Sequence, residues 1–223
     1  MPRSARLLLS VLLILAGAAI VATLAMHQAQ RHSLEDDAAR AQQQLSLYAN
    51  TLQTLIERYR ALPAVLALDP QMRNALQGPV TPEITQTLNL KLEQINGAAR
   101  SSTLELLDRN GLAIGASNWR LPSSYVGHNY GFRPYFTQTK ANGVGRFYAV
   151  GVTSGIPGYF LSNAVRDDAG QFIGAMVVKL EFPDLEHTWA QGDDLLLVSD
   201  AKGIMFIANH PGWRYRALRP LSE

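Results

Sequence analysis

The stretch NYGFRPYFTQTKANGVGRFYAVGVTSGIPGYFLS, from Asn129 to Ser162, decides the fold of this chain. It is rich in aromatic, glycine and hydroxyl residues and has no helical periodicity, so it predicts short strands and loops around a polar centre. Arg133 lies inside it. An arginine buried there needs an anion, because unpaired buried charge is very costly. The anion can be a carboxylate of the protein or of a ligand, and the sequence leaves both open.

The composition narrows the class of protein. The chain has 223 residues, a formal net charge of +2 and no cysteine. The near-neutral charge argues against a nucleic-acid partner. The lack of cysteine excludes disulfides, thiolate zinc sites and cysteine nucleophiles. The histidines show no metal-ligand spacing, and nucleotide-binding and hydrolase motifs are missing. We therefore expect no catalytic residue, no metal and no cofactor within this chain.

Leu7–Met26 carries no charged residue and is about as long as the ~20 residues that a membrane-spanning helix needs. Arg3 and Arg6 precede it, which places residues 1–6 in the cytoplasm. We therefore expect a span at 7–26 in the inner membrane, with residues 27–223 on the periplasmic side. A cleaved signal peptide is the alternative, although its apolar region is usually shorter.

A long helix is predicted from His27 to Leu62. Its apolar residues recur at alternating steps of four and three. They are Leu34, Ala38, Ala41, Leu45, Tyr48, Leu52, Leu55, Tyr59 and Leu62. This stripe can pack on the chain's own domain or form the seam of a homodimer, and the two can coexist. Pro63 should end or bend the helix.

An α+β module should follow. Proline after a capping residue predicts helices over 70–77 and 82–95, the second stopped by Asn96-Gly97. Another short helix is expected at 184–189. The β-rich runs predict a five-stranded, largely antiparallel sheet flanked by the upstream helices. These runs are 103–107, 112–117, 145–152, 158–165 and 172–182.

A D-x-x-G turn occurs twice between apolar runs, at Asp108–Gly111 and at Asp200–Gly203. The matching runs on both sides indicate an internal repeat. We therefore expect a membrane-distal module over 63–190 and the start of a membrane-proximal module over 191–223. One hairpin cannot close a core, so the chain is expected to be an N-terminal fragment of something longer.

The anchor, the long helix and the tandem sheet modules together resemble the double Cache (PAS-like) sensor regions of bacterial membrane receptors. Three segments sharpen the resemblance: FRPYF at 132–136, GVGRFYAVGVTSGIPGYFLSNAV at 143–165 and PGWRYRALRPL at 211–221. They are similar to the C4-dicarboxylate sensor histidine kinases of the DctB type.

The resemblance implies that the distal module binds succinate, fumarate or malate outside the cell. It also implies a signal through the membrane to an ATP-dependent kinase, which would phosphorylate an NtrC-type response regulator. That kinase is absent from these residues. The same input could instead belong to a chemoreceptor, to a cyclic-dinucleotide enzyme, or to an anchored protein that binds another carboxylate.

By this resemblance, the ligand-contacting positions are Tyr130, Arg133, Thr153, Ser154 and Lys179, with Tyr159 as a further candidate. Two cationic groups and several hydroxyls suit a ligand with two carboxylates. Each position has a structural alternative. The arginine could pair with a protein carboxylate, the lysine could lie on a solvated strand face, and the others could be turn or core residues.

Overall fold

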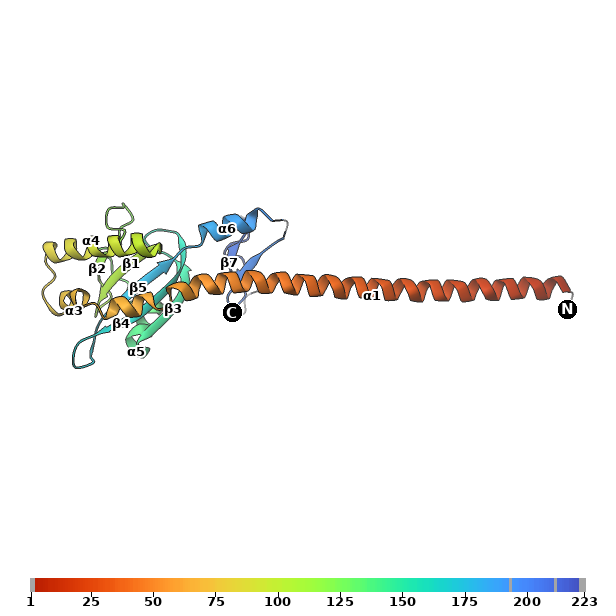
Figure 1. The fold of residues 1–223 in the computed structure, drawn as a ribbon, viewed down its shortest axis with the longest axis horizontal. Helices are drawn as coiled ribbons and strands as arrows, with labels where there is room; N and C mark the ends of the chain where they lie inside the picture. The colour runs from red at the N-terminus through yellow and green to blue at the C-terminus, as the bar shows by residue number, and fades with distance from the viewer. Residues whose placement is uncertain (1–2, 193, 211, 221–223) are drawn as a thin grey trace. The chain divides into compact units, whose positions relative to one another are not determined.

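The computed structural model describes residues 3–192, 194–210 and 212–220, and of residues 3–16, 18 and 19 it describes the backbone alone (Figure 1). The chain divides into two units, Met1–Leu55 and Ile56–Glu223. Most of the predicted membrane span at 7–26 falls on residues whose side chains lie outside this description. Within the described residues, no helix combines the length and the apolar character needed to cross a membrane.

The first helix, α1 (Arg3–Tyr59), is uninterrupted. It contains almost all of the predicted heptad helix but ends three residues before Leu62. The chain turns there and begins α2 (Leu62–Ala67), which holds Pro63 in its first turn. A proline costs little at that position, because the first N–H groups of a helix have no partner within the helix.

Helix α3 (Pro70–Gln77) has the predicted bounds, and the Asp69 carboxylate caps it by accepting from the Gln71 N–H at 2.8 Å. Helix α4 (Pro82–Ala99) begins as predicted, but its predicted end at Ile95 is wrong. The helix continues through Asn96-Gly97 to Ala99 and is capped by Arg100, which has a left-handed φ of 56°. A single glycine weakens a helix by only about 1 kcal/mol, so it need not stop one.

Helix α5 (Pro134–Asn142) corrects the expectation that the whole of 129–162 forms strands and loops. The helix starts at a proline and ends at Gly143, whose φ is 84°. Both are ordinary signals of helix termini. The helical pattern is weak because α5 buries only Tyr135, Phe136 and Thr139.

The predicted five-stranded antiparallel sheet is confirmed. Its order is β2-β1-β5-β4-β3, and all four pairings are antiparallel. The strands are β1 (Thr103–Asp108), β2 (Ala113–Ala116), β3 (Val144–Val150), β4 (Pro157–Arg166) and β5 (Phe172–Leu180). Helix α6 (Pro183–Ala190) follows the last strand.

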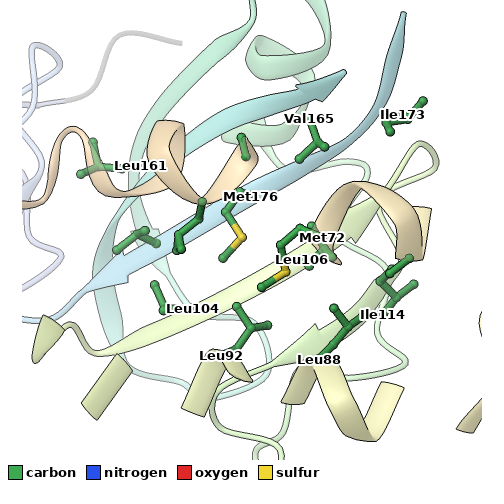
Figure 2. Packing of buried hydrophobic residues seen from close by; sticks show 14 of the residues in the cluster. Met72, Leu88, Leu92, Leu104, Leu106, Ile114, Leu161, Val165, Ile173 and Met176 are labelled. Atoms are coloured by element: carbon green, nitrogen blue, oxygen red, sulfur yellow. The ribbon is translucent and has the colours of Figure 1, made fainter. Parts of the chain in front are cut away.

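The two faces of the sheet bury different clusters. One face packs on α2, α3 and α4 through aliphatic side chains. Figure 2 shows Leu104, Leu106 and Met176 from the strands lying together with Met72 and Leu88 from the helices. The other cluster is mainly aromatic and includes side chains from α5 and from the loop before it. It contains Tyr125, Tyr130, Tyr135, Phe136 and Phe160.

The two D-x-x-G turns have the same geometry. In each, the aspartate Oδ1 accepts from the N–H groups two and four residues further on, at 2.8–2.9 Å for Asp108 and 2.9 Å for Asp200. Gly111 and Gly203 have φ values of 87° and 85°. Asp167 heads a third turn of this kind, so the turn alone does not establish a repeat.

The likeness extends beyond the turn. After the first hairpin, the Tyr130 N–H donates back to the Gly111 carbonyl at 2.7 Å. After the second, formed by β6 (Leu197–Ser199) and β7 (Met205–Ala208), the Leu218 N–H donates to the Gly203 carbonyl at 2.8 Å. The returning chain thus closes on the same glycine position in both hairpins, and the repeat itself stays a prediction.

Candidate ligand-binding site

The candidate site lies on the aromatic face of the sheet. Side chains alternate between the two faces of a strand. Glu105 of β1, Phe160 of β4 and Lys179 of β5 therefore share this face, and Phe160 pairs directly with Lys179 in the β4–β5 ladder. Two charged side chains thus lie in an apolar layer, which requires a specific partner for each.

Lys179 is buried, with 1% of its area exposed. Its ammonium donates to Glu181 Oε1 at 2.5 Å and to Ser154 Oγ at 3.0 Å. Gly158 makes room for its stem, because a Cβ there would lie 2.6 Å from the lysine Cε. The alternative of an exposed lysine on a solvated strand face is therefore excluded.

Arg133 is the residue before α5 and is half-buried. Its guanidinium donates to the Val150 carbonyl at 2.9 Å, and its Cζ lies 5.8 Å from the centre of the Phe160 ring. The Lys179 ammonium lies 5.9 Å from the same ring. Across the described part of the chain, no salt bridge includes Arg133. Within the described residues, Arg133 therefore forms no salt bridge with a protein carboxylate, although its charge acts on that of Glu105.

The loop between β3 and β4 supplies the hydroxyls. Thr153 Oγ1 lies 2.7 Å from the Tyr130 hydroxyl. Ser154 Oγ accepts from the Tyr125 hydroxyl at 3.3 Å as well as from Lys179. Five of the six predicted residues are therefore joined through direct contacts or through the Phe160 ring.

Tyr159 is the exception. It neighbours Phe160 in β4, so it points to the opposite face of the sheet, where it packs against the aliphatic cluster. The structure does not bring it to the other five residues, and we leave it out of the proposed site.

Glu105 is the main residue that sequence reasoning missed. It is 2% exposed, and its Oε1 accepts from the Tyr135 hydroxyl at 3.3 Å. Burial raises its pKa to about 8, although the Tyr135 hydrogen bond and the charges of Lys179 and Arg133 act in the opposite direction. One signal was present in the sequence, since a single glutamate interrupts the apolar run TLELLD.

A small pocket lies among several of these groups, although Lys179 and Ser154 are not part of its lining. It is lined by Glu105, Tyr125, Tyr130, Arg133, Tyr135, Gly151, Val152, Thr153 and Phe160. Its free space has room for little more than one water molecule. The Tyr135 ring stacks on Phe160 with centroids 4.8 Å apart, which makes this wall rigid. The pocket therefore combines cationic, hydroxyl and carboxyl groups in a small, partly enclosed space.

Two curated proteins are similar to this chain. The C4-dicarboxylate transport sensor protein DctB of Rhizobium meliloti (strain 1021) is 39% identical over 178 residues, which cover 80% of this chain and 28% of that protein. The protein of the same name from Pseudomonas aeruginosa PAO1 is 34% identical over 194 residues, which cover 87% of this chain and 32% of that protein. Over these residues, the chain belongs to the DctB-type sensors. It spans about a third of the length of these relatives.

Solved structures agree with this family. The sensor domain of the V. cholerae histidine kinase DctB matches with a TM-score of 0.77 at 28% identity, covering 82% of this chain and 70% of that chain. The ligand-binding domain of the Pseudomonas fluorescens chemoreceptor CtaA, in complex with L-isoleucine, matches with a TM-score of 0.57 at 18% identity. The match covers 85% of this chain and 76% of that chain. That second likeness concerns the fold alone. No family model matches the chain.

Proposed function

We propose that this chain is the periplasmic sensing part of a membrane-bound histidine kinase that responds to C4-dicarboxylates such as succinate, fumarate and malate. The carrying observation is the pair of cations around Phe160: Lys179, already matched by Glu181, and Arg133, with no carboxylate partner among the described residues. An arginine without a salt-bridge partner can bind a ligand carboxylate through two parallel hydrogen bonds.

The Thr153–Ser154 loop is the entry route in this proposal. The pocket is smaller than a four-carbon dianion, so the segment 151–156 must move outward or rearrange when the ligand enters. The hydrogen bonds of this loop to the tyrosine hydroxyls are side-chain contacts, which can be exchanged for contacts to the ligand. Such a change couples ligand binding to the position of β3 and β4.

The signal route that we propose continues through β3. The Tyr148 hydroxyl donates to the Phe206 carbonyl at 3.0 Å, and the two rings lie 4.0 Å apart. Arg214 also pairs with Glu186 of α6 at 2.5 Å. These contacts join the first module to the hairpin that we assign to the start of a second, membrane-proximal module. A shift of β3 would therefore move the residues of the second module that contact it.

The proposal places α1 in a homodimer seam anchored by the apolar run at 7–26 in the inner membrane. Leu34 and Leu45 of the heptad stripe are 68% and 60% exposed in the single chain. Tyr59, at the other end of the stripe, packs against the aliphatic cluster of the module. The exposed leucines support a partner helix, whereas Tyr59 supports packing on the domain. Kinase output, ATP use and an NtrC-type regulator belong to the rest of the proposed parent protein.

Calorimetry on the full chain in lipid nanodiscs tests the ligand class. We expect succinate, fumarate and malate to bind at pH 7, and L-isoleucine and L-valine to give no heat. The physical reason is that two carboxylates match Arg133 and Lys179, whereas an ammonium group would meet them with like charge. Binding of the amino acids without any dicarboxylate would show that the ligand class is wrong.

Arg133→Ala should weaken succinate binding by at least about 30-fold, because charged hydrogen-bonded contacts at a binding site contribute roughly 2–5 kcal/mol. Arg146→Ala is the matched control, since Arg146 is exposed on neighbouring β3. Its affinity should stay within about twofold of wild type. Equal affinities for the two variants would make Arg133 a structural residue, and the thermal midpoints of both report whether the fold is intact.

A further inference from the structure

Glu105 is a buried carboxyl group that the proposed ligand contacts do not yet use. Its Oε1 accepts from Tyr135, while Oε2 is buried and has no hydrogen-bond partner among the described residues. Buried polar atoms are almost always paired in native proteins. Since Glu105 also lines the pocket with Arg133 and Thr153, this oxygen is placed to contact a bound ligand.

The charges around Glu105 decide which protonation state can coexist with a dianion. Tyr135 faces it from α5, Arg133 from the start of that helix, and Tyr130 from the preceding loop; Lys179 acts on it from β5. Glu181 pairs with Lys179. β2, on its other side, has the sequence AIGA and no titratable side chain. Together with Glu181, an ionised Glu105 and a dianion would bring four negative charges against the two positive charges of Lys179 and Arg133.

Protonation of Glu105 reduces that excess of negative charge by one and creates a hydrogen-bond donor. Burial raises the pKa of Glu105 to about 8, so the carboxyl is mostly neutral at pH 7. A neutral carboxyl group donates one hydrogen bond, whereas a carboxylate only accepts. A ligand dianion next to it favours the neutral form further, because like charges disfavour ionisation.

We propose that Glu105 is a specificity-determining residue that binds the ligand dianion as a neutral carboxylic acid, donating a hydrogen bond to a ligand carboxylate, so that a proton is taken up with the ligand wherever Glu105 is ionised in the free protein. This rests on the proposed function, since it concerns the same pocket. It makes the sensor respond to ambient pH as well as to dicarboxylate, and it disfavours ligands that bring an ammonium group to this position.

The sign of the pH dependence follows from the two states. At pH 7 the free protein already holds the proton, so binding exchanges almost none. Above pH 8 the free carboxyl is ionised, and binding must take up a proton, which lowers affinity as pH rises. Both carboxyl groups of a C4-dicarboxylate ionise below pH 7, so the ligand stays a dianion throughout this range. Burial raises the pKa of Tyr130 and Tyr135, so neither ionises in this range.

The test is succinate calorimetry on the full chain in nanodiscs at pH 7, 8 and 9, in two buffers that differ in ionisation enthalpy. We expect uptake of almost no proton at pH 7, about half a proton at pH 8 and about one at pH 9, with Kd rising about tenfold from pH 7 to pH 9. Glu105→Gln keeps a donor and cannot ionise. It should bind at pH 7 within about threefold of wild type and lose both the uptake and the pH dependence.

Glu105→Leu is also uncharged but has no hydrogen-bond donor, so it shows whether the donor matters beyond the loss of charge. This variant should bind succinate about tenfold more weakly than Glu105→Gln at pH 7. Succinate binding without proton uptake at pH 8 and 9 overturns this inference and leaves the proposed function standing. No dicarboxylate binding at any pH overturns both. Amino-acid binding with proton release at pH 7 also overturns the inference, because Glu105 would then act as an acceptor.

Discussion

Replacing Lys179 with methionine is expected to reduce succinate affinity by about 30-fold or more, which calorimetry on the full chain measures. Methionine fills much of the space of the buried lysine stem, so the main loss is the charge. That loss also leaves the Glu181 carboxylate in the site without its ion-pair partner. An unmatched carboxylate repels a dianion and remains partly desolvated, and breaking a buried charge pair at a binding site costs about 2–5 kcal/mol.

Lys91→Met is the matched control for this variant. Lys91 forms a comparable ion pair with Asp69, at 2.6 Å, between α4 and the start of α3 on the other side of the sheet. Lys91→Met should slightly lower the free energy of unfolding and leave succinate affinity unchanged. The double variant Lys179→Met/Glu181→Gln removes both charges, so it should regain stability without regaining affinity. Wild-type affinity in Lys179→Met would assign the lysine a purely structural role.

Gly145→Ala is expected to lower the free energy of unfolding by about 3 kcal/mol or more, as measured by chemical denaturation. A Cβ at Gly145 would overlap the Tyr135 carbonyl oxygen and lie 2.6 Å from Thr139 Oγ1 and 2.7 Å from Ser162 Oγ. Those buried groups already share hydrogen bonds that hold α5 on the sheet: the two hydroxyls lie 2.6 Å apart, and Ser162 donates to the Tyr135 carbonyl at 3.1 Å. Overpacking at such a point forces the backbone to shift.

The same substitution at Gly97 is the control, and it should raise the free energy of unfolding instead of lowering it. Gly97 is exposed within α4, and a Cβ there would meet nothing within 4 Å. Gly97→Ala should therefore stabilise the protein by roughly 0.5–1 kcal/mol, because alanine loses less backbone entropy in a helix. Similar unfolding midpoints for the two variants would show that α5 does not approach the sheet closely at Gly145. Since Arg133 immediately precedes α5, Gly145→Ala should also weaken succinate binding.

Much of the fold could be predicted from local signals. The helix at 70–77 was placed correctly because a capping aspartate and a proline mark its start, and these act within one turn. The strands were found because β-rich runs alternate with turn residues. Helix α5 was missed because it buries few side chains and so lacks periodicity, although Pro134 and Gly143 mark its two ends. Periodicity reports burial on one face, and it weakens when a short helix is only lightly covered.

The candidate site was only partly predictable, for a different reason. Alternation along β4 requires that Tyr159 and Phe160 face opposite ways, but it does not say which face holds the pocket. That depends on where α5 packs, and α5 is held there by Ser162 and Thr139. Likewise, the sequence shows that Lys179 points to the other face of its strand from Met176 and Val178. Its burial, however, depends on the loop at Ser154 and on Glu181, which both contact its ammonium group.

By itself, then, the stretch from Asn129 to Ser162 determined the aromatic, hydroxyl and arginine content of the site, because composition and strand alternation are local properties. Only the tertiary structure decided that Arg133 lacks a carboxylate partner among the described residues, that Lys179 is buried, and that Glu105 of a distant strand lines the same pocket. The physical reason is that burial and charge pairing depend on long-range strand register and helix packing. Those contacts join residues that the local pattern treats separately.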